Sequence, residues 1–261
     1  MVLTQIISGK DNMKQSINKW LKNNHLFKLD SIASFIFKQC CLLCVANHSQ
    51  KFGLCQDCLN NLTWSPKSNC PQCGLNSNGE ICGYCISSSP DFDATYAIFV
   101  YAYPIDTMIQ RYKYNGTLNL SHTFGQLMSE KLHATNRDGA IDLIIPMPMH
   151  PTRLKEREFN QALEIAKILT KSLNKNNALK LDYKSVIRQT LTPPQASLPL
   201  KDRVKNIKGA FKVTKELAGK RIAIVDDVMT TGASLNELAK TLKKAGATYV
   251  ECWVIARTLP H

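Results

Sequence analysis

The sequence predicts an α/β protein in which helices cover both faces of a parallel sheet, preceded by a small cysteine-rich module. After residue 93, short apolar runs alternate with segments of helical periodicity, as expected for parallel strands that are buried on both faces. Nine of the ten cysteines fall between Cys40 and Cys85, which sets that region apart by composition. The chain has 261 residues, 44% of them hydrophobic, so it can form a substantial core plus an accessory module.

Three regions are expected along the chain. Residues 1–35 form an N-terminal extension, either a short amphipathic helix or a partly disordered segment. Residues 36–88 form the cysteine module, and residues 89–261 form the α/β domain. The Ser, Pro and Asp residues of ISSSPDFD, residues 86–93, are typical of a linker or turn between the last two regions.

The elements of the α/β domain follow from two sequence patterns, continuous apolar runs and apolar residues repeated at helical spacing. Four runs rich in apolar, aromatic and β-branched residues are predicted strands: residues 94–103, 141–147, 221–227 and 248–256. Three segments repeat apolar residues at helical spacing and are predicted helices: residues 120–132, 159–173 and 234–246.

Four C-x-x-C pairs predict two zinc sites in the cysteine module. Two such pairs supply the four thiolates of a tetrahedral zinc site, and the ligands would be Cys41, Cys44, Cys55, Cys58, Cys70, Cys73, Cys82 and Cys85. Ten residues separate the first pair from the second and eight separate the third from the fourth, which favours two consecutive ribbons. The alternative is a cross-brace of the first pair with the third and the second with the fourth. Because each site is closed by four protein ligands, structural zinc is expected, with Cys40 outside both sites.

The overall charge indicates anionic partners. Lys and Arg number 33 against 20 Asp and Glu, which gives a net charge of +13 and suits phosphates or nucleic acid. The alternative is a solvated surface of scattered lysines, since no run of five like charges occurs. We find neither a signal peptide nor an apolar stretch of about 18 residues, so a cytoplasmic protein without membrane insertion is expected. Paired cysteines in such a reducing compartment more often hold metal than form disulfides.

The segment RIAIVDDVMTTGASL, residues 221–235, predicts a ligand site at a strand end. It contains neither a P-loop nor a dinucleotide fingerprint. The loop TTGAS offers backbone N–H groups and hydroxyls at a helix N-terminus, which suits a monophosphate. Asp226 and Asp227 suit a sugar diol or a divalent cation, so ribose 5-phosphate would satisfy both halves. The alternative for the two acids is a capping or turn pair that follows a strand.

The segment VDDVMTTGAS resembles the motif that binds phosphoribosyl pyrophosphate in type I phosphoribosyltransferases. The chain as a whole resembles the ComF/GntX family of competence-associated proteins over about residues 36–258. This resemblance includes the cysteine pairs, RYKYNG at residues 111–116 and PMPMHPTRLKEREFNQA at residues 146–162. It also includes a spaced set of residues: Arg188, Gln195, Leu198, Arg203, Asn206, Ala210 and Phe211.

The resemblance implies a type I phosphoribosyltransferase-like sheet with an N-terminal double zinc ribbon. Asp226 and Asp227 would be the catalytic pair, binding the ribose hydroxyls. The 5'-phosphate would bind to Thr230, Thr231, Gly232, Ala233 and Ser234. The pyrophosphate would lie beside PMPMHPTR, with Mg²⁺ bridging its oxygens.

Four cations are candidates for the pyrophosphate: Arg111, Lys113, Arg153 and Arg157. The alternative for each is an ordinary basic surface. His150 is expected to shape its loop, with proton transfer as the alternative. Glu158 departs from the family, in which many members have glycine, and an acid there would repel a nearby pyrophosphate. Ser234 stands where threonine is frequent, which keeps the hydroxyl donor.

The function implied is a phosphoribosyltransferase-like protein that binds phosphoribosyl pyrophosphate and Mg²⁺ and is associated with natural competence and DNA uptake. No segment identifies an acceptor for phosphoribosyl transfer. The alternative is a non-catalytic competence factor that binds single-stranded DNA or DNA-processing proteins and uses the pocket for ligand sensing. Its support is the positive charge, the two ribbons and the family's link to transformation.

Overall fold

The computed structural model describes residues 40–46, 51–114, 117–135, 141–174, 178–191 and 207–259. The chain divides into two compact units, Met1–Gln56 and Asp57–His261. The predicted extension at residues 1–35 lies outside the described residues. The same holds for four members of the spaced motif, namely Gln195, Leu198, Arg203 and Asn206.

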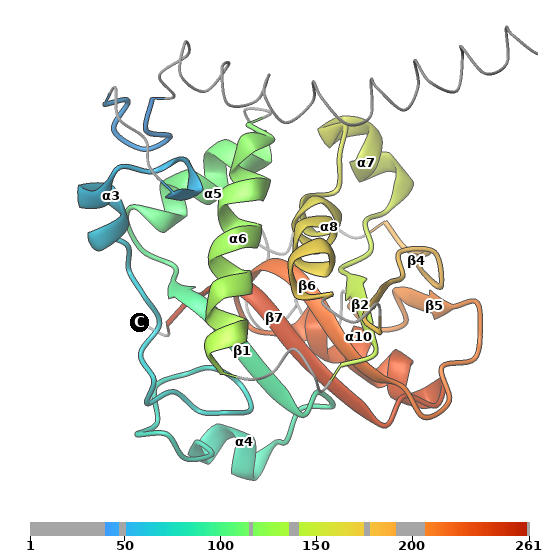
Figure 1. Cartoon of the computed structure of the whole chain (residues 1–261). Helices are drawn as coiled ribbons and strands as arrows, with labels where there is room; N and C mark the ends of the chain where they lie inside the picture. The colour runs from blue at the N-terminus through green and yellow to red at the C-terminus, as the bar shows by residue number, and fades with distance from the viewer. Residues whose placement is uncertain are drawn as a thin grey trace, which may run out of the picture. The chain divides into compact units, whose positions relative to one another are not determined.

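The second unit is built on a parallel sheet of five strands in the order β1-β7-β6-β2-β3 (Figure 1). The strands are β1 (Ala94–Val100), β2 (Leu143–Pro146), β3 (Lys180–Leu181), β6 (Arg221–Met229) and β7 (Tyr249–Arg257). Val225 of β6 pairs with Pro146 on one side and with Trp253 on the other. Both β6 and β7 have neighbours on both sides, and their central residues are buried, so the predicted parallel sheet is confirmed.

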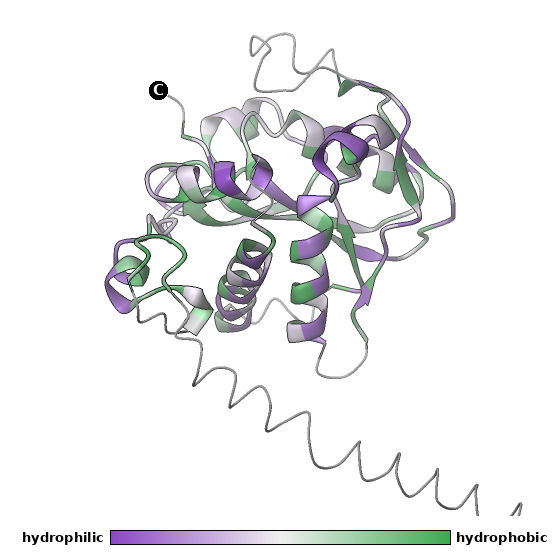
Figure 2. Ribbon diagram, turned by 90° about the horizontal axis from the view of Figure 1, so that it is seen from above, coloured by the Kyte–Doolittle hydropathy of each residue, from purple (hydrophilic) through white to green (hydrophobic). Residues whose placement is uncertain are grey.

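Helices cover both faces of this sheet (Figure 1). On one face α6 (Asn119–Ala134) packs beside α8 (Gln161–Leu173), and α10 (Ala233–Lys244) covers the other. The two helices on the shared face approach closely at Gly125, where an added Cβ would lie 2.6 Å from Cβ of Ile168. Hydrophobic residues concentrate in the strands between the helical layers (Figure 2). Among the helices that the structure describes, none has the length and apolar character needed to cross a bilayer.

Several further elements were not predicted from the two sequence patterns. They are η1 (Lys51–Gly53), α3 (Gln56–Asn60), α4 (Gly83–Ser87), α5 (Ile105–Tyr114), α7 (Pro151–Arg157), and the antiparallel pair β4 (Val186–Arg188) and β5 (Phe211–Val213). β6 also runs two residues further than the predicted strand, to Met229, so Asp226 and Asp227 are followed by two more strand residues. Strands of two or three residues are too short to show an alternating pattern.

Residues 63–65, which lie between the second and third cysteine pairs, bond to β1 through backbone hydrogen bonds. Ser65 N–H donates to the Ile98 carbonyl (2.9 Å) and Val100 N–H donates to the Thr63 carbonyl (2.8 Å). The ring of Trp64 packs on Phe99 with centroids 4.7 Å apart. This part of the cysteine module therefore belongs to the same compact unit as the sheet.

Candidate functional site

A cavity of ≈ 350 Å³ opens at the carboxyl ends of β2 and β6. Ligands bind at this end of the strands in open α/β sheets. Its lining comes from α5, the loop after β2, α7, the start of α8, β4 and the loop after β6. The charged groups around it are Lys113, Arg153, Arg157, Arg188, Asp226 and Asp227. The cavity therefore joins both halves of the predicted ribose-phosphate site to a set of cations.

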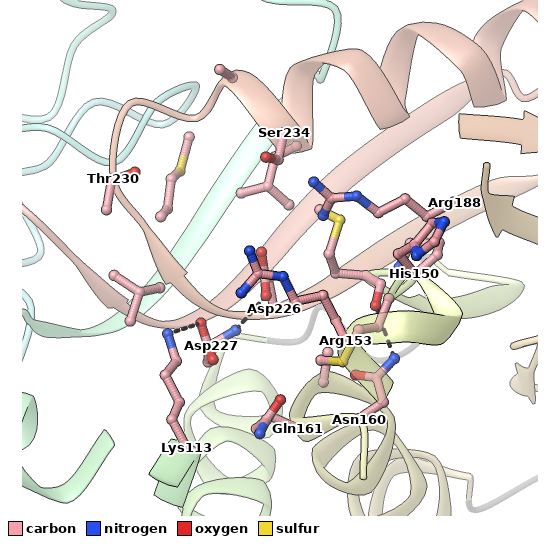
Figure 3. Close-up of a pocket in the computed structure, with 18 of the residues that line it drawn as sticks. Lys113, His150, Arg153, Asn160, Gln161, Arg188, Asp226, Asp227, Thr230 and Ser234 are labelled. Atoms are coloured by element: carbon pink, nitrogen blue, oxygen red, sulfur yellow. Dashed lines mark hydrogen bonds and ion pairs between the residues drawn. The ribbon is translucent and has the colours of Figure 1, made fainter. Parts of the chain in front are cut away.

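The two acids lie next to each other at the end of β6. Asp227 N–H donates to Oδ1 of Asp226 (2.9 Å), and Nζ of Lys113 lies 3.0 Å from Oδ1 of Asp227 (Figure 3). Asp227 is 9% exposed. The carboxylates therefore face the cavity with one cation already paired to one of them.

The pKa values of these groups are strongly perturbed. Burial, followed by the negative charge of Asp227, raises the pKa of Asp226 to about 7, against the opposing effects of Lys113 and Arg188. Burial alone would lower the pKa of Lys113, but the charge and hydrogen bond of Asp227 raise it above the usual value. Perturbed titratable groups clustered in a cleft indicate a functional site.

The loop after β6 has the geometry of a phosphate cradle. Gly232, at the N-cap of α10, has a φ of 79°, and an added Cβ would lie 2.7 Å from Cε of Met229. Ala233 N–H donates to Oγ1 of Thr231 (3.3 Å). Within the described part of the chain, the N–H groups of Gly232, Ser234 and Leu235 meet no protein acceptor. Such donors at a helix N-terminus favour an anion.

Three of the four predicted pyrophosphate cations line the cavity. Arg153 extends into it from α7 and Lys113 from α5 (Figure 3). Arg157 donates to Oε1 of Gln161 (3.4 Å) and lies over the ring of Tyr114, 5.5 Å from its centroid. Arg111 does not line the cavity, because residues two apart on a helix point to different sides.

Three further cavity residues were not predicted as ligand-binding. Arg188 extends from β4 toward the phosphate loop (Figure 3). Gln161 is 2% exposed, and its Nε2 donor has no acceptor among the described residues. Asn160 caps α8 by accepting from Leu163 N–H (3.3 Å), and it donates to the Met147 carbonyl (3.1 Å). The only sequence signal for these residues was their place in the family's motifs.

His150 and Glu158 lie at the two ends of α7. Nδ1 of His150 accepts from Thr152 N–H (3.3 Å) and so caps the helix, in agreement with a role in shaping the loop. Glu158 ends the helix in the left-handed conformation, with a φ of 66°. It lines a neighbouring groove rather than the cavity, so this acid does not contact the candidate pyrophosphate position directly.

The eight predicted cysteine ligands form two clusters in the consecutive arrangement, not in the cross-brace. In each cluster the four sulfurs lie within 4.8 Å of one another; one cluster holds Cys41, Cys44, Cys55 and Cys58, and the other Cys70, Cys73, Cys82 and Cys85. In the first cluster the sulfurs of Cys44 and Cys55 lie 3.7 Å apart, and in the second those of Cys73 and Cys82 lie 3.5 Å apart. A tetrahedral site with Zn–S bonds of about 2.3 Å places its sulfurs about 3.8 Å apart, so both clusters fit zinc.

Backbone donors support thiolates at equivalent positions of the two clusters. Cys55 N–H donates to Sγ of Cys41 (3.3 Å), and Cys82 N–H donates to Sγ of Cys70 (3.4 Å). Burial works against the charged form, but backbone hydrogen bonds lower the pKa of Cys41 to about 6 and that of Cys70 to about 7. Thiolate is the form that binds metal.

Known proteins show similarity over most of the chain. Residues 160–259 match the family described as phosphoribosyl transferase domain. Competence protein F of Haemophilus influenzae is 33% identical over 229 residues, which cover 83% of this chain and 96% of that protein. DNA utilization protein YhgH of Escherichia coli K12 is 31% identical over 213 residues, which cover 80% and 92%. A purine phosphoribosyltransferase structure from Pyrococcus horikoshii matches 62% of this chain and 87% of its own, with 17% identity and a TM-score of 0.32.

Proposed function

The chain belongs to the competence protein F family, and from this premise we propose that it binds phosphoribosyl pyrophosphate together with Mg²⁺. The ligand would occupy the cavity at the ends of β2 and β6, and the protein would serve DNA uptake or utilisation in the cytoplasm. Phosphoribosyl transfer to an acceptor is the activity that this site is suited to perform. The acceptor is left to experiment.

One observation carries the proposal: a carboxylate pair, Asp226 and Asp227, and a phosphate cradle at residues 230–234 line the same cavity. Asp226 and Asp227 offer acceptors for a ribose diol, and the N–H groups at the start of α10 offer donors for the 5'-phosphate. A ligand with a diol at one end and a phosphate at the other satisfies both.

The remaining cations suit a second, more highly charged group. Lys113, Arg153 and Arg188 approach the cavity from three different elements. Charge-assisted contacts of this kind stabilise a pyrophosphate, and Mg²⁺ binds through substrate oxygens and one or two carboxylates. When bound, Mg²⁺ would neutralise charge on the leaving pyrophosphate as the bond to ribose C1 breaks. The arginines and Lys113 would stabilise the same group through the protein.

We also propose that both cysteine clusters hold structural zinc. Each has four sulfur ligands and no open position for a substrate, and zinc in such a site contributes directly to folding.

Calorimetry tests the proposal with phosphoribosyl pyrophosphate and Mg²⁺. The full chain should bind with one site, and binding should fall at least tenfold in the variant that carries Asp226→Ala and Asp227→Ala. Glu216→Ala is the matched control, since it removes an exposed acid that does not line the cavity. No binding by the unmodified chain, or equal binding by the double variant, would overturn the proposal. Incubation with a panel of nucleobases and an assay for released pyrophosphate then shows whether transfer occurs.

The second candidate function is binding of single-stranded DNA. It is favoured by the net charge of +13 and by relatives that are named for competence and DNA utilisation. Each phosphate contact should make the slope of log affinity against log salt concentration more negative by about 0.7. Fluorescence anisotropy with a labelled oligonucleotide tests this, and the absence of association at low salt would exclude it. Competition by phosphoribosyl pyrophosphate would indicate that DNA reaches the cavity.

A further inference from the structure

We propose that Arg257 is a positioning residue that couples the second cysteine cluster to the phosphate loop. Metal in the cluster of Cys70, Cys73, Cys82 and Cys85 would thereby raise the affinity of the loop for phosphate. This inference rests on the phosphate site proposed above. It adds a control of that site by the metal state of a cluster that does not line the cavity.

The guanidinium of Arg257 joins the two sites directly. Arg257 is the last residue of β7 and is 5% exposed. Its Nε donates to the Cys73 carbonyl (3.0 Å). Its Nη1 donates to the carbonyls of Met229 (3.0 Å) and Thr230, and also to that of Thr258 (3.0 Å). One buried side chain therefore bonds the backbone of a cysteine ligand and the first residues of the loop.

The contact with Thr230 orients a group of the loop. The peptide unit is planar and trans, so a carbonyl and the N–H that follows it point in opposite directions. Because Arg257 holds the Thr230 carbonyl, it fixes the direction of the Thr231 N–H, and its bond to Met229 does the same for the Thr230 N–H. Both threonines line the cavity. Arg257 thereby sets the geometry of donors at the phosphate position.

A second set of contacts runs beside the first. Thr95 N–H donates to the carbonyl of Pro71, which lies between two cysteine ligands (2.9 Å). Oγ1 of Thr95 lies 3.9 Å from Sδ of Met229. The Met229 side chain in turn packs where a Cβ on Gly232 would be. The cluster thus reaches Met229 before the loop and Gly232, the N-cap of α10, through packed neighbours.

Metal determines whether the acceptor for Arg257 stays in place. Without metal, four thiols with sulfurs this close lose the bonds that hold their loops together, and thiolates among them repel one another. The Cys73 carbonyl would then no longer be fixed, and a buried arginine would lose one of its acceptors. The loop would be held less firmly, so phosphate binding would carry an additional ordering cost.

Thermodynamic reciprocity provides the first test. If metal strengthens ligand binding, the ligand must strengthen metal binding by the same factor. Zinc release to a colorimetric chelator would be followed with and without saturating ribose 5-phosphate. A full chain with Cys41→Ser and Cys44→Ser reports on the second cluster, and one with Cys73→Ser and Cys82→Ser reports on the first. At equilibrium with the chelator, we expect the zinc dissociation constant of the second cluster to fall by at least about fivefold, and that of the first cluster to be unchanged.

The second test removes the connection itself. Arg257→Lys keeps the charge but lacks the planar fork that contacts several carbonyls at once. We expect its dissociation constant for ribose 5-phosphate to rise about tenfold, with faster amide hydrogen exchange at residues 230–235. Arg221→Lys is the control, since this arginine lies at the opposite end of the sheet. In the chain with Cys73→Ser and Cys82→Ser, Arg257→Lys should cause little further loss, because the connection is already broken.

The outcomes separate the two proposals. If the unmodified chain binds neither ribose 5-phosphate nor phosphoribosyl pyrophosphate, the proposed function fails. If it binds, but zinc release is insensitive to ligand and Arg257→Lys binds equally well, only the coupling is overturned. A purely structural role for Arg257 would lower thermal stability without changing affinity or the effect of ligand on zinc release. If Arg257→Lys does not fold, the effect of ligand on zinc binding by the second cluster still tests the coupling.

Discussion

Nζ of Lys113 lies 3.0 Å from Oδ1 of Asp227, so a cation from α5 occupies one of the two carboxylates that we assign to the ribose diol. The two roles compete where a ribose hydroxyl takes the lone-pair position on this oxygen that the ammonium holds. A displaced Lys113 would remain in the cavity that Arg153 and Arg157 also line, where it would contact the proposed pyrophosphate. The ion pair therefore keeps the lysine in the site before the ligand arrives.

Lys113→Met should affect two ligands differently. Phosphoribosyl pyrophosphate loses a charged contact, and its dissociation constant should rise about tenfold, which corresponds to about 1.4 kcal/mol. Ribose 5-phosphate lacks the pyrophosphate and no longer has to break the ion pair, so its affinity should stay equal or increase. Calorimetry with both ligands measures this, with Lys240→Met as the exposed control. A similar loss for both ligands would contradict the assignment of Lys113 to the pyrophosphate.

Ligand affinity should rise with pH through about 7. A ribose hydroxyl donates to an ionised carboxylate, and burial with the nearby Asp227 charge raises the pKa of Asp226 to about 7. The ionised fraction of such a group grows about tenfold from pH 6 to pH 8, and affinity should follow. Titration of the ligand's own phosphates is separated by comparison with Asp226→Asn, which should bind weakly with a flatter profile. Parallel profiles for the two proteins would refute the role of Asp226.

The same pKa shift affects stability in the opposite direction. Between about pH 4 and pH 7, the folded chain holds a proton on Asp226 that the unfolded chain has lost. The contribution of this residue to folding stability therefore falls as pH rises. Asp226→Asn should therefore be more stable than the unmodified chain at pH 8, and the difference should shrink toward pH 4. Urea unfolding at both values measures it. A variant that is less stable at pH 8 would show that the carboxylate stabilises the fold.

Gly232→Ala should weaken phosphate binding at least tenfold while the chain remains folded. An alanine there must adopt a φ of 79° and place Cβ 2.7 Å from Cε of Met229, so either the Met229 methyl group or the loop has to shift. Gly219→Ala is the matched control, because Gly219 also has a positive φ of 71° but nothing lies within 4 Å of its added Cβ. Both variants should lose similar stability, and only the first should lose affinity for ribose 5-phosphate.

Glu158→Gly should stabilise the protein by about 1 kcal/mol, because Glu158 is held in the left-handed region that glycine adopts without steric cost. Glu158→Ala removes the same carboxylate and keeps the strain, so it should gain little. Ligand affinity should be unchanged in both, since this residue does not line the cavity. Denaturant unfolding of the three proteins distinguishes backbone strain from charge as the cause.

Metal analysis should find two zinc ions per chain. Cys44→Ser and Cys73→Ser should each lower the count to one, because they remove a ligand from different clusters. Cys40→Ser should leave it at two, since Cys40 is exposed and belongs to neither cluster. A count below two in the unmodified, metal-replete chain would contradict the double zinc ribbon.

The long elements could be predicted because they repeat a pattern over many residues. The buried strands that became β1, β2, β6 and β7 show continuous apolar runs, and α6, α8 and α10 show helical spacing. The acids and the phosphate loop could be predicted because they are adjacent in sequence. Cysteine spacing similarly favoured the consecutive clusters that the structure shows.

The rest of the site depends on distant contacts that a single sequence does not reveal. Arg188 reaches the cavity from a three-residue strand, and Arg111 misses it because α5 turns Lys113 inward instead. Arg257 is the last residue of a strand with no nearby motif, and two of its acceptors lie 28 and 184 residues away in the chain. Only the packing of the sheet brings such groups together.

The pairing of β1 with β7 also sets the order in which the protein can be assembled during synthesis. Ala94 lies beside Glu251, so β1 leaves the ribosome well before its strand partner. At about 5–20 residues per second, the gap is roughly 8 to 30 seconds. The other edge of β1 bonds to residues 63–71, which are made first. The cysteine segment can therefore cover one edge of a new strand while its permanent neighbour is still being translated.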